Sequence, residues 1–88
     1  MPPESGEVRA WLVERGYTDR DLVILKYATL EGNRVYRREI ASQALGAVTA
    51  AKDVSAEDLG TVEEPDLQER YAAEAKRMES THDPDDEV

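Results

Sequence analysis

The stretch "YATLEGNRVYRREIASQALG", from Tyr27 to Gly46, decides the fold because it is compatible with two different structures. If the chain reverses at Gly32 and Asn33, the residues on either side form a β-hairpin. If it instead runs as helix into "RREIASQALG", the same stretch becomes half of a helix-turn-helix. We expect the hairpin, and the helix-turn-helix remains the open alternative for residues 19–46.

The hairpin interpretation predicts a specific set of cross-strand pairs. The segment "LVILKYATL" is rich in β-formers, and glycine in the first central position suits a two-residue type II′ turn. With that turn, the numbers of opposed residues sum to 65. The pairs are Glu31 with Arg34, Leu30 with Val35, Thr29 with Tyr36, Tyr27 with Arg38, Lys26 with Glu39, and Leu25 with Ile40. No like charges face each other, and each favourable pair contributes roughly 0.2–1 kcal/mol.

In the helical alternative, Thr18 caps a helix that reaches Leu30, and "RREIASQALG" is the first helix of the motif. The latter segment also resembles part of a winged-helix regulator. The next segment, "AVTAAKDV", would then read the DNA, and its one cation is Lys52. A recognition helix needs donors for base edges and several cations for phosphates. Because the segment offers only one cation, a DNA-binding regulator that uses Arg37, Arg38 and Lys52 ranks as the second hypothesis, after the hairpin-based module.

The stretch "SGEVRAWLVERGY" predicts a short N-terminal amphipathic helix. Val8, Trp11 and Leu12 recur at helical spacing, Ser5 can cap the helix and Gly16 can end it. We expect Trp11 to anchor this helix on the rest of the domain, because large aromatic side chains dominate small cores.

The stretch "TVEEPDLQERYAAEAKRMES" predicts a longer C-terminal helix. Pro65 fits its first turn, and the apolar stripe consists of Leu67, Tyr71, Ala75 and Met78. "SAEDLG" predicts one helical turn capped by Ser55, whereas residues 41–54 are compatible with helix or strand. The predicted class is α+β: a central hairpin packed with an N-terminal helix and a longer C-terminal helix. We expect one domain over residues 1–80 and a disordered acidic tail over residues 81–88.

Composition excludes several classes of site. The net charge is -9, from 20 acidic and 11 basic residues, and the only lysines are Lys26, Lys52 and Lys76. With no cysteine and one histidine, His82, we expect no disulfide, no metal site and no cofactor. The chain has no long apolar run and begins with a polar segment, so we expect a cytoplasmic protein. The acidic surface repels phosphate backbones, which disfavours nucleic acid as a partner.

No motif indicates catalysis, because the lone histidine lies in the tail and no glycine-rich phosphate loop is present. We assign no catalytic residue and expect that the protein is not an enzyme. The one cationic cluster is a possible ligand or partner patch, formed by Arg34, Arg37, Arg38, Tyr27 and Tyr36. In the predicted hairpin, Arg37 faces away from the other four side chains. A basic patch with tyrosines can stack and neutralise a ligand, but such arginines more often pair with nearby carboxylates.

A hairpin alone is not stable, and this one carries apolar side chains on both faces. Helices can cover one face. Covering the second face, or extending the sheet at its edges, invites a second copy of the chain, so we expect a homodimer.

The stretches "LVILKYATLEGNRVYRRE" and "ERYAAEAKRMESTHDPDDEV", in an acidic and lysine-poor background, resemble small acidic proteins of halophilic archaea. The resemblance implies a salt-adapted cytoplasmic protein and brings no catalytic residues with it. The expected function is a non-catalytic protein-interaction or assembly module.

Overall fold

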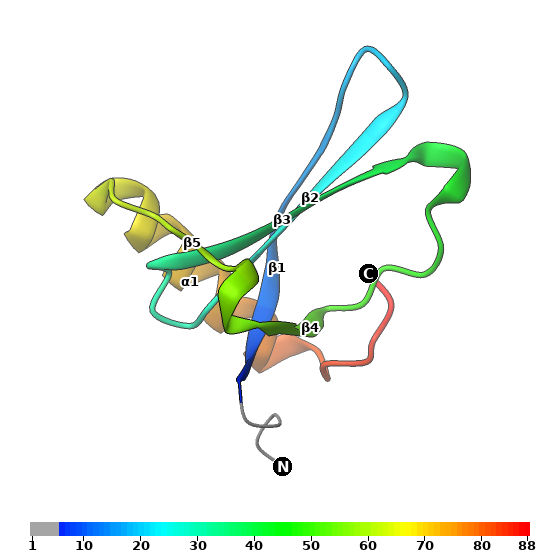
Figure 1. Ribbon diagram of the computed structural model, residues 1–88. Helices are drawn as coiled ribbons and strands as arrows, with labels where there is room; N and C mark the ends of the chain where they lie inside the picture. The colour runs from blue at the N-terminus through cyan, green and yellow to red at the C-terminus, as the bar shows by residue number, and fades with distance from the viewer. Residues whose placement is uncertain (1–5) are drawn as a thin grey trace.

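A computed structural model describes residues 6–88 and shows a five-stranded sheet with one long helix (Figure 1). The strand order is β4-β1-β2-β3-β5, and all neighbouring strands are antiparallel. The elements are β1 (Glu7–Tyr17), β2 (Leu22–Ala28), β3 (Arg34–Ala41), the 3-10 helix η1 (Ser42–Ala44), β4 (Ala51–Ser55), the 3-10 helix η2 (Ala56–Asp58), β5 (Gly60–Thr61) and α1 (Pro65–Thr81). The predicted α+β class is confirmed.

The hairpin expected around Gly32 is present as β2 and β3, but its register differs from the predicted one by two residues. Tyr27 lies opposite Tyr36, so the numbers of opposed residues sum to 63. The turn is wider than two residues, because Thr29 pairs with Arg34 and leaves residues 30–33 between the strands. Within this turn Gly32, at φ 74°, donates its N–H to the carbonyl of Thr29 at 2.9 Å. A shift of two residues keeps each side chain on its predicted face and changes only its partner.

The helix-turn-helix alternative is wrong. Residues 22–28 and 34–41 are strands, and within residues 19–46 the only helical element is the three-residue η1. The β-branched and aromatic run in β2 pairs with a strand on each side, β1 and β3, which gives these residues the packing that strands favour.

The N-terminal helix predicted over residues 5–17 is also wrong, since β1 occupies this position. Trp11 lies opposite Ala28 and Leu12 opposite Tyr27, so neighbouring apolar side chains face opposite sides of the sheet. A strand that is covered on both faces is apolar without alternation, which imitates helical spacing. Gly16, the expected helix end, lies inside β1, and Ser5, the expected cap, lies outside the described residues.

The predicted C-terminal helix is confirmed as α1, with Pro65 in its first turn. Its buried residues are Tyr71, Ala75 and Met78, and Leu67 is partly buried against the core. Figure 1 shows α1 crossing one side of the sheet. No helix among residues 6–88 is long and apolar enough to cross a membrane.

The link between β3 and β4, residues 42–50, packs against the hydrophobic core. Its Val48 and Ala50 are buried and share one core cluster with Leu12 and Leu25. The register places Leu12 and Leu25 on the face opposite Trp11, and all three side chains are buried, so apolar side chains on both faces of the sheet are covered. The chain thus covers both faces of its own hairpin, which weakens the original reason for expecting a second copy there.

One segment of chain occupies both edges of the β1–β2–β3 meander. β4 pairs with β1, and β5 pairs with Arg34 and Val35 of β3. Between them, the Ser55 hydroxyl accepts a hydrogen bond from the N–H of Glu57 at 3.4 Å, as expected for the capped turn of "SAEDLG". The sheet therefore curls toward closure.

Contrary to the disordered tail expected over residues 81–88, Thr81 is the last residue of α1 and residues 84–88 lie beside the start of β4. The N–H of Ala50 donates to the Asp86 carbonyl at 2.8 Å, and the N–H of Val88 donates to the Val48 carbonyl at 2.9 Å. These contacts are made by the backbone, so the acidic side chains of the tail give no signal for them in the sequence.

Candidate partner-binding surface

The two tyrosines of the predicted patch belong to the core. Tyr27 is 3% exposed, and its ring centroid lies 6.1 Å from that of the partly buried Tyr36, with the rings tilted by 38°. Burial raises the pKa of Tyr27, because the charged phenolate loses its hydration there. Tyr27 is therefore not exposed to stack on a ligand, and the two rings stabilise the hairpin by packing on each other.

Arg34 is also committed to the fold. Its Nη2 donates to the backbone carbonyl of Ala56 at 3.0 Å, so the side chain joins the start of β3 to η2. This contact fixes the crossing of the chain from the β1 edge to the β3 edge of the sheet.

The exposed members of the predicted patch are Arg37 and Arg38, which lie on opposite faces of β3. Arg37 Nη1 lies 3.1 Å from Glu39 Oε2, and both side chains are about half exposed, at 51% and 40%. The predicted pairing of arginine with nearby carboxylate is thus present for Arg37. The predicted pairs of Tyr27 with Arg38 and of Lys26 with Glu39 are not formed, because of the two-residue shift.

A row of charged side chains crosses three strands on the face that carries α1. Lys26 lies opposite Glu14 of β1 and opposite Arg37 of β3. Glu14 accepts both Lys26, at 3.2 Å, and Arg70 of α1, at 3.3 Å. The hydrogen bond to Glu14 raises the pKa of Lys26. Lys26 and Arg37 repel each other because they lie directly opposite, and the carboxylates of Glu14, beside Lys26, and Glu39, beside Arg37, offset that repulsion.

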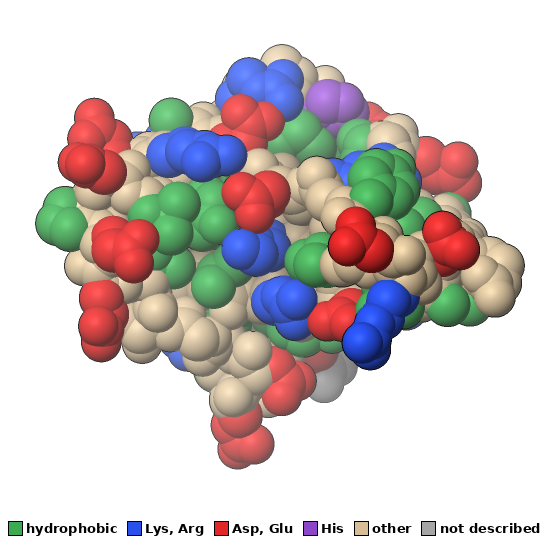
Figure 2. Space-filling view, turned by 90° about the horizontal axis from the view of Figure 1, so that it is seen from above, with side chains coloured by type: hydrophobic (Ala, Val, Ile, Leu, Met, Phe, Trp, Pro, Cys, Tyr) green, Lys and Arg blue, Asp and Glu red, His purple; other side chains and the backbone are tan. Residues whose placement is uncertain are grey.

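Basic and acidic side chains are interleaved on the molecular face in Figure 2, with apolar side chains between them. A shallow cavity of about 310 Å³ adjoins the charged row. Its apolar floor comes from Val35, Val62, Leu67 and Tyr71, and its charged rim from Lys26, Arg37, Glu63 and Glu64. A rim with both signs of charge suits a polypeptide, which carries both, better than it suits a simple anion.

In the part of the chain that the structure describes, the outer edge of β3 is open beyond Val35. Within residues 6–88, β5 is the only strand on that edge, and it pairs with Arg34 and Val35 alone. The carbonyl of Asn33 accepts the N–H of Val62 at 2.9 Å, so the backbone groups of Asn33 point outward. Alternate residues of a strand point to the same edge, so the backbone groups of Arg37, Glu39 and Ala41 point outward as well. Unpaired groups of this kind can accept another strand.

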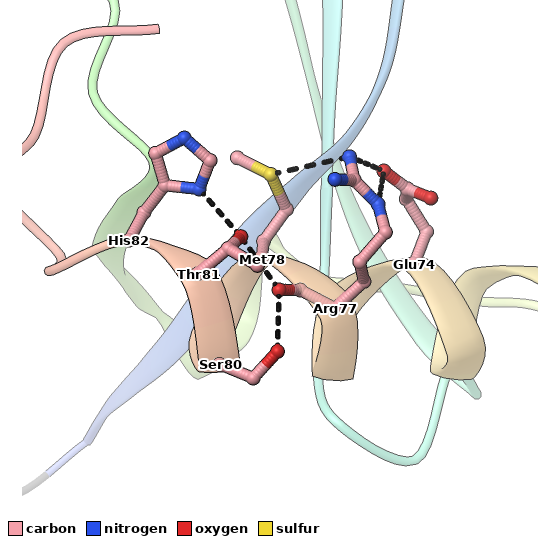
Figure 3. A network of polar contacts seen from close by, with 6 residues as sticks. All are labelled: Glu74, Arg77, Met78, Ser80, Thr81 and His82. Carbon is pink, nitrogen blue, oxygen red and sulfur yellow. Dashed lines mark hydrogen bonds and ion pairs between the residues drawn. The ribbon is translucent and has the colours of Figure 1, made fainter.

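A second shallow cavity, of about 270 Å³, lies where the end of α1 meets β1. Figure 3 shows the polar network beside it. Arg77 Nε donates to Glu74 Oε1 at 3.0 Å, and this contact lowers the pKa of Glu74. His82 Nδ1 lies 2.8 Å from the Thr81 hydroxyl. Because Glu74 neutralises Arg77, the network leaves no unpaired charge directed at a ligand.

The described residues show no group of three or more histidine, cysteine, aspartate or glutamate side chains placed to hold a metal ion. His82 and the carboxylates of the tail therefore do not converge within residues 6–88.

A comparison with protein families matches residues 4–88 to a model described as "Family of unknown function (DUF7967)". The chain belongs to DUF7967. No curated protein and no solved structure matches it.

For this DUF7967 chain the sequence indicated the two exposed arginines and an extendable sheet edge, but it did not show which residues of β3 form that edge. The signal for the edge is the charged sequence "RRE", residues 37–39, inside a strand whose other residues, apart from Arg34, are apolar or aromatic. Natural proteins place such charges on edge strands to limit uncontrolled pairing. Recognising the signal requires knowing that β3 is an edge strand over these residues, and that depends on where β5 ends.

Proposed function

We propose that this domain is a non-catalytic protein-interaction or assembly module that acts in the cytoplasm as a homodimer. Association takes place through the β2–β3 hairpin, at the outer edge of β3. The observation that carries the proposal is this edge, where the backbone groups of Arg37, Glu39 and Ala41 have no strand partner within residues 6–88. Strand addition at an exposed sheet edge is a recurrent mode of protein association.

The side chains at the edge support controlled rather than indiscriminate pairing. Arg37, Arg38 and Glu39 are all exposed, and they carry both signs of charge. A partner strand gains affinity from backbone hydrogen bonds, and the charges select which strand fits. The mixed-charge cavity beside Arg37 extends the surface available to a polypeptide.

We further propose that the acidic surface is an adaptation to high salt. No acidic side chain among residues 6–88 is buried, and the net charge is -9 with only three lysines, Lys26, Lys52 and Lys76. Exposed carboxylates keep the surface hydrated, and salt screens their mutual repulsion within a few ångströms, roughly 3 Å at 1 M. The midpoint of thermal unfolding should therefore rise between dilute buffer and molar potassium chloride. A midpoint that falls or stays constant contradicts salt adaptation.

Sedimentation equilibrium over the micromolar range, at low and at molar salt, tests the homodimer. Two variants test the edge: Glu39→Pro removes an outward N–H, and its control, Glu39→Thr, loses the same carboxylate but keeps the N–H. We expect the proline variant to be monomeric at concentrations where the threonine variant still associates. A monomeric wild-type chain at every concentration contradicts the homodimer, and equal association of the two variants contradicts the use of this edge.

A further inference from the structure

We infer that two copies of the chain join their β3 strands in antiparallel fashion about a two-fold axis at Arg38, so that Arg37 of each copy pairs with the partner's Glu39. This inference rests on the homodimer proposed above and specifies its geometry. It follows from symmetry, from the space left by β5, and from charge.

Symmetry restricts the possible registers. In an antiparallel pair, opposed side chains point to the same face of the sheet. A two-fold axis between identical strands therefore passes through a residue that opposes its own copy, and residues at equal distances on either side oppose each other. The candidates for the axial residue on the open edge are Arg37, Arg38, Glu39 and Ile40.

β5 limits how far a partner strand can extend. Gly60 lies opposite Val35, so the place beside Val35 is occupied. With Arg37 on the axis, the partner's Glu39 would have to lie beside Val35, where Gly60 already lies. The only hydrogen-bonded pair left would then be Arg37 opposite the partner's Arg37. With Arg38 on the axis, pairing runs from Tyr36 to Ile40, and the partner chain turns away at Ala41, where β3 ends and η1 begins.

Charge selects among the remaining registers. An axis at Arg38 opposes Arg37 to the partner's Glu39 twice, by symmetry, and both residues direct their backbone groups outward, so each pair can exchange two hydrogen bonds. An axis at Glu39 adds a bonded pair but opposes two carboxylates in a chain of net charge -9. An axis at Ile40 opposes Glu39 to the partner's Ala41 and leaves Arg37 without an acidic partner.

The Arg38 axis has one unfavourable contact. The two Arg38 side chains oppose each other on the other face of the sheet, with their Cβ atoms about 4.5–5.5 Å apart. The long side chains can splay apart, but part of the repulsion remains. Arg38→Gln should therefore strengthen the dimer, a result that the other registers do not predict.

A charge-exchange series measured by sedimentation equilibrium in about 0.15 M salt, where the Debye length is about 8 Å, tests the register. Arg37→Glu and Glu39→Arg each turn two attractive cross-strand pairs into repulsive ones, so each should weaken dimerisation roughly tenfold or more. The double variant Arg37→Glu/Glu39→Arg restores both attractions with reversed polarity, and its dissociation constant should return to within about threefold of the wild-type value.

Matched controls separate charge at the edge from charge elsewhere. Lys76→Glu and Glu79→Arg make the same changes in net charge at exposed positions in the last turns of α1, which packs on β1 and β2. They should leave the dissociation constant within about threefold of wild type, because charges more than a Debye length from the contact are largely screened. The thermal midpoints of the dilute monomers should stay close to the wild-type value for all variants, because exposed ion pairs contribute little.

The outcomes distinguish the register from the homodimer itself. If the wild-type chain dimerises but the double variant is no better than the worse single variant, the Arg38 register is wrong and the homodimer proposal stands. If Arg37→Glu leaves the dissociation constant of the dimer unchanged, the axis does not pass through Arg38 and lies at Glu39 or Ile40 instead. A wild-type chain that stays monomeric overturns both.

Discussion

Replacing Gly32 with alanine should destabilise the fold strongly, because Gly32 is fixed by both its conformation and its surroundings. Its φ is 74°, a region in which residues with a Cβ atom are strained. A Cβ atom built there would lie 2.1 Å from the carbonyl oxygen of Gln68 and 2.5 Å from the backbone nitrogen of Ala72. Both neighbours are backbone atoms of α1, so no side-chain rotation can relieve the overlap.

The cost has two parts. The left-handed conformation costs an alanine about 1–2 kcal/mol relative to glycine. Inserting the methyl group against the helix backbone costs about 1–3 kcal/mol more, as in other overpacked sites. The turn would have to lift away from α1, which would loosen Leu30 from the core that it packs against. The free energy of unfolding should therefore fall by about 2–5 kcal/mol, out of a total of about 5–15 kcal/mol for a typical domain.

Urea unfolding, followed by far-UV circular dichroism and by the fluorescence of Trp11, measures this loss. Gly46→Ala is the matched control, because no heavy atom lies within 4 Å of a Cβ atom added at Gly46 and its φ is not in the left-handed region. The control should change the free energy of unfolding by no more than about 0.5 kcal/mol. If the two variants unfold at the same urea concentration with equal slopes, the close contact between the hairpin turn and α1 is refuted.

Three further predictions concern the core and two titrating groups. Leu25→Ala, at a side chain that is 1% exposed, should cost about 2–5 kcal/mol in the same urea assay, and a loss below about 1 kcal/mol would place Leu25 outside the core. Burial raises the pKa of the Tyr27 phenol, so the contribution of Tyr27 to stability is complete below the pKa of the unfolded chain and is lost as the pH rises through the folded pKa. The variant Tyr27→Phe should therefore lose less stability than the wild type at alkaline pH. Alkaline unfolding that is the same in both proteins would argue against burial of Tyr27. The hydrogen bond from Arg77 lowers the pKa of Glu74, so the contribution of Glu74 to stability is present above the unfolded pKa and is lost as the pH falls through the folded pKa. The variant Arg77→Gln should therefore slightly flatten the dependence of the free energy of unfolding on pH at acid pH. An unchanged dependence would show that the pair is not formed in solution.

The elements that could be predicted from the sequence depend on local signals. The turn at Gly32, the start of α1 at Pro65 and the cap at Ser55 are each set by residues within a few positions. Their physical basis is the conformational range of glycine, the fixed φ of proline and a hydroxyl group near free N–H groups. The apolar stripe of α1 is equally local, because its spacing follows from the helix period.

The candidate site was only partly predictable. The sequence indicated Arg37 and Arg38 as exposed cations, and they are exposed. It could not show that Tyr27 is buried or that Arg34 bonds to Ala56, because both facts depend on segments that follow β3 in the chain. It also placed Lys26 opposite Glu39 instead of Arg37, since the register depends on how the turn packs against α1.

The sequence by itself determined that the protein is a small, strongly acidic α+β domain with a hairpin turn at Gly32 and a helix from Pro65. Only the tertiary structure decided that residues 7–17 form a strand and that, among the described residues 6–88, no strand covers the edge of β3 beyond Val35. The physical reason is that a strand has no internal hydrogen bonds, so its neighbours, which lie far away in the chain, determine whether it forms and which edge stays free.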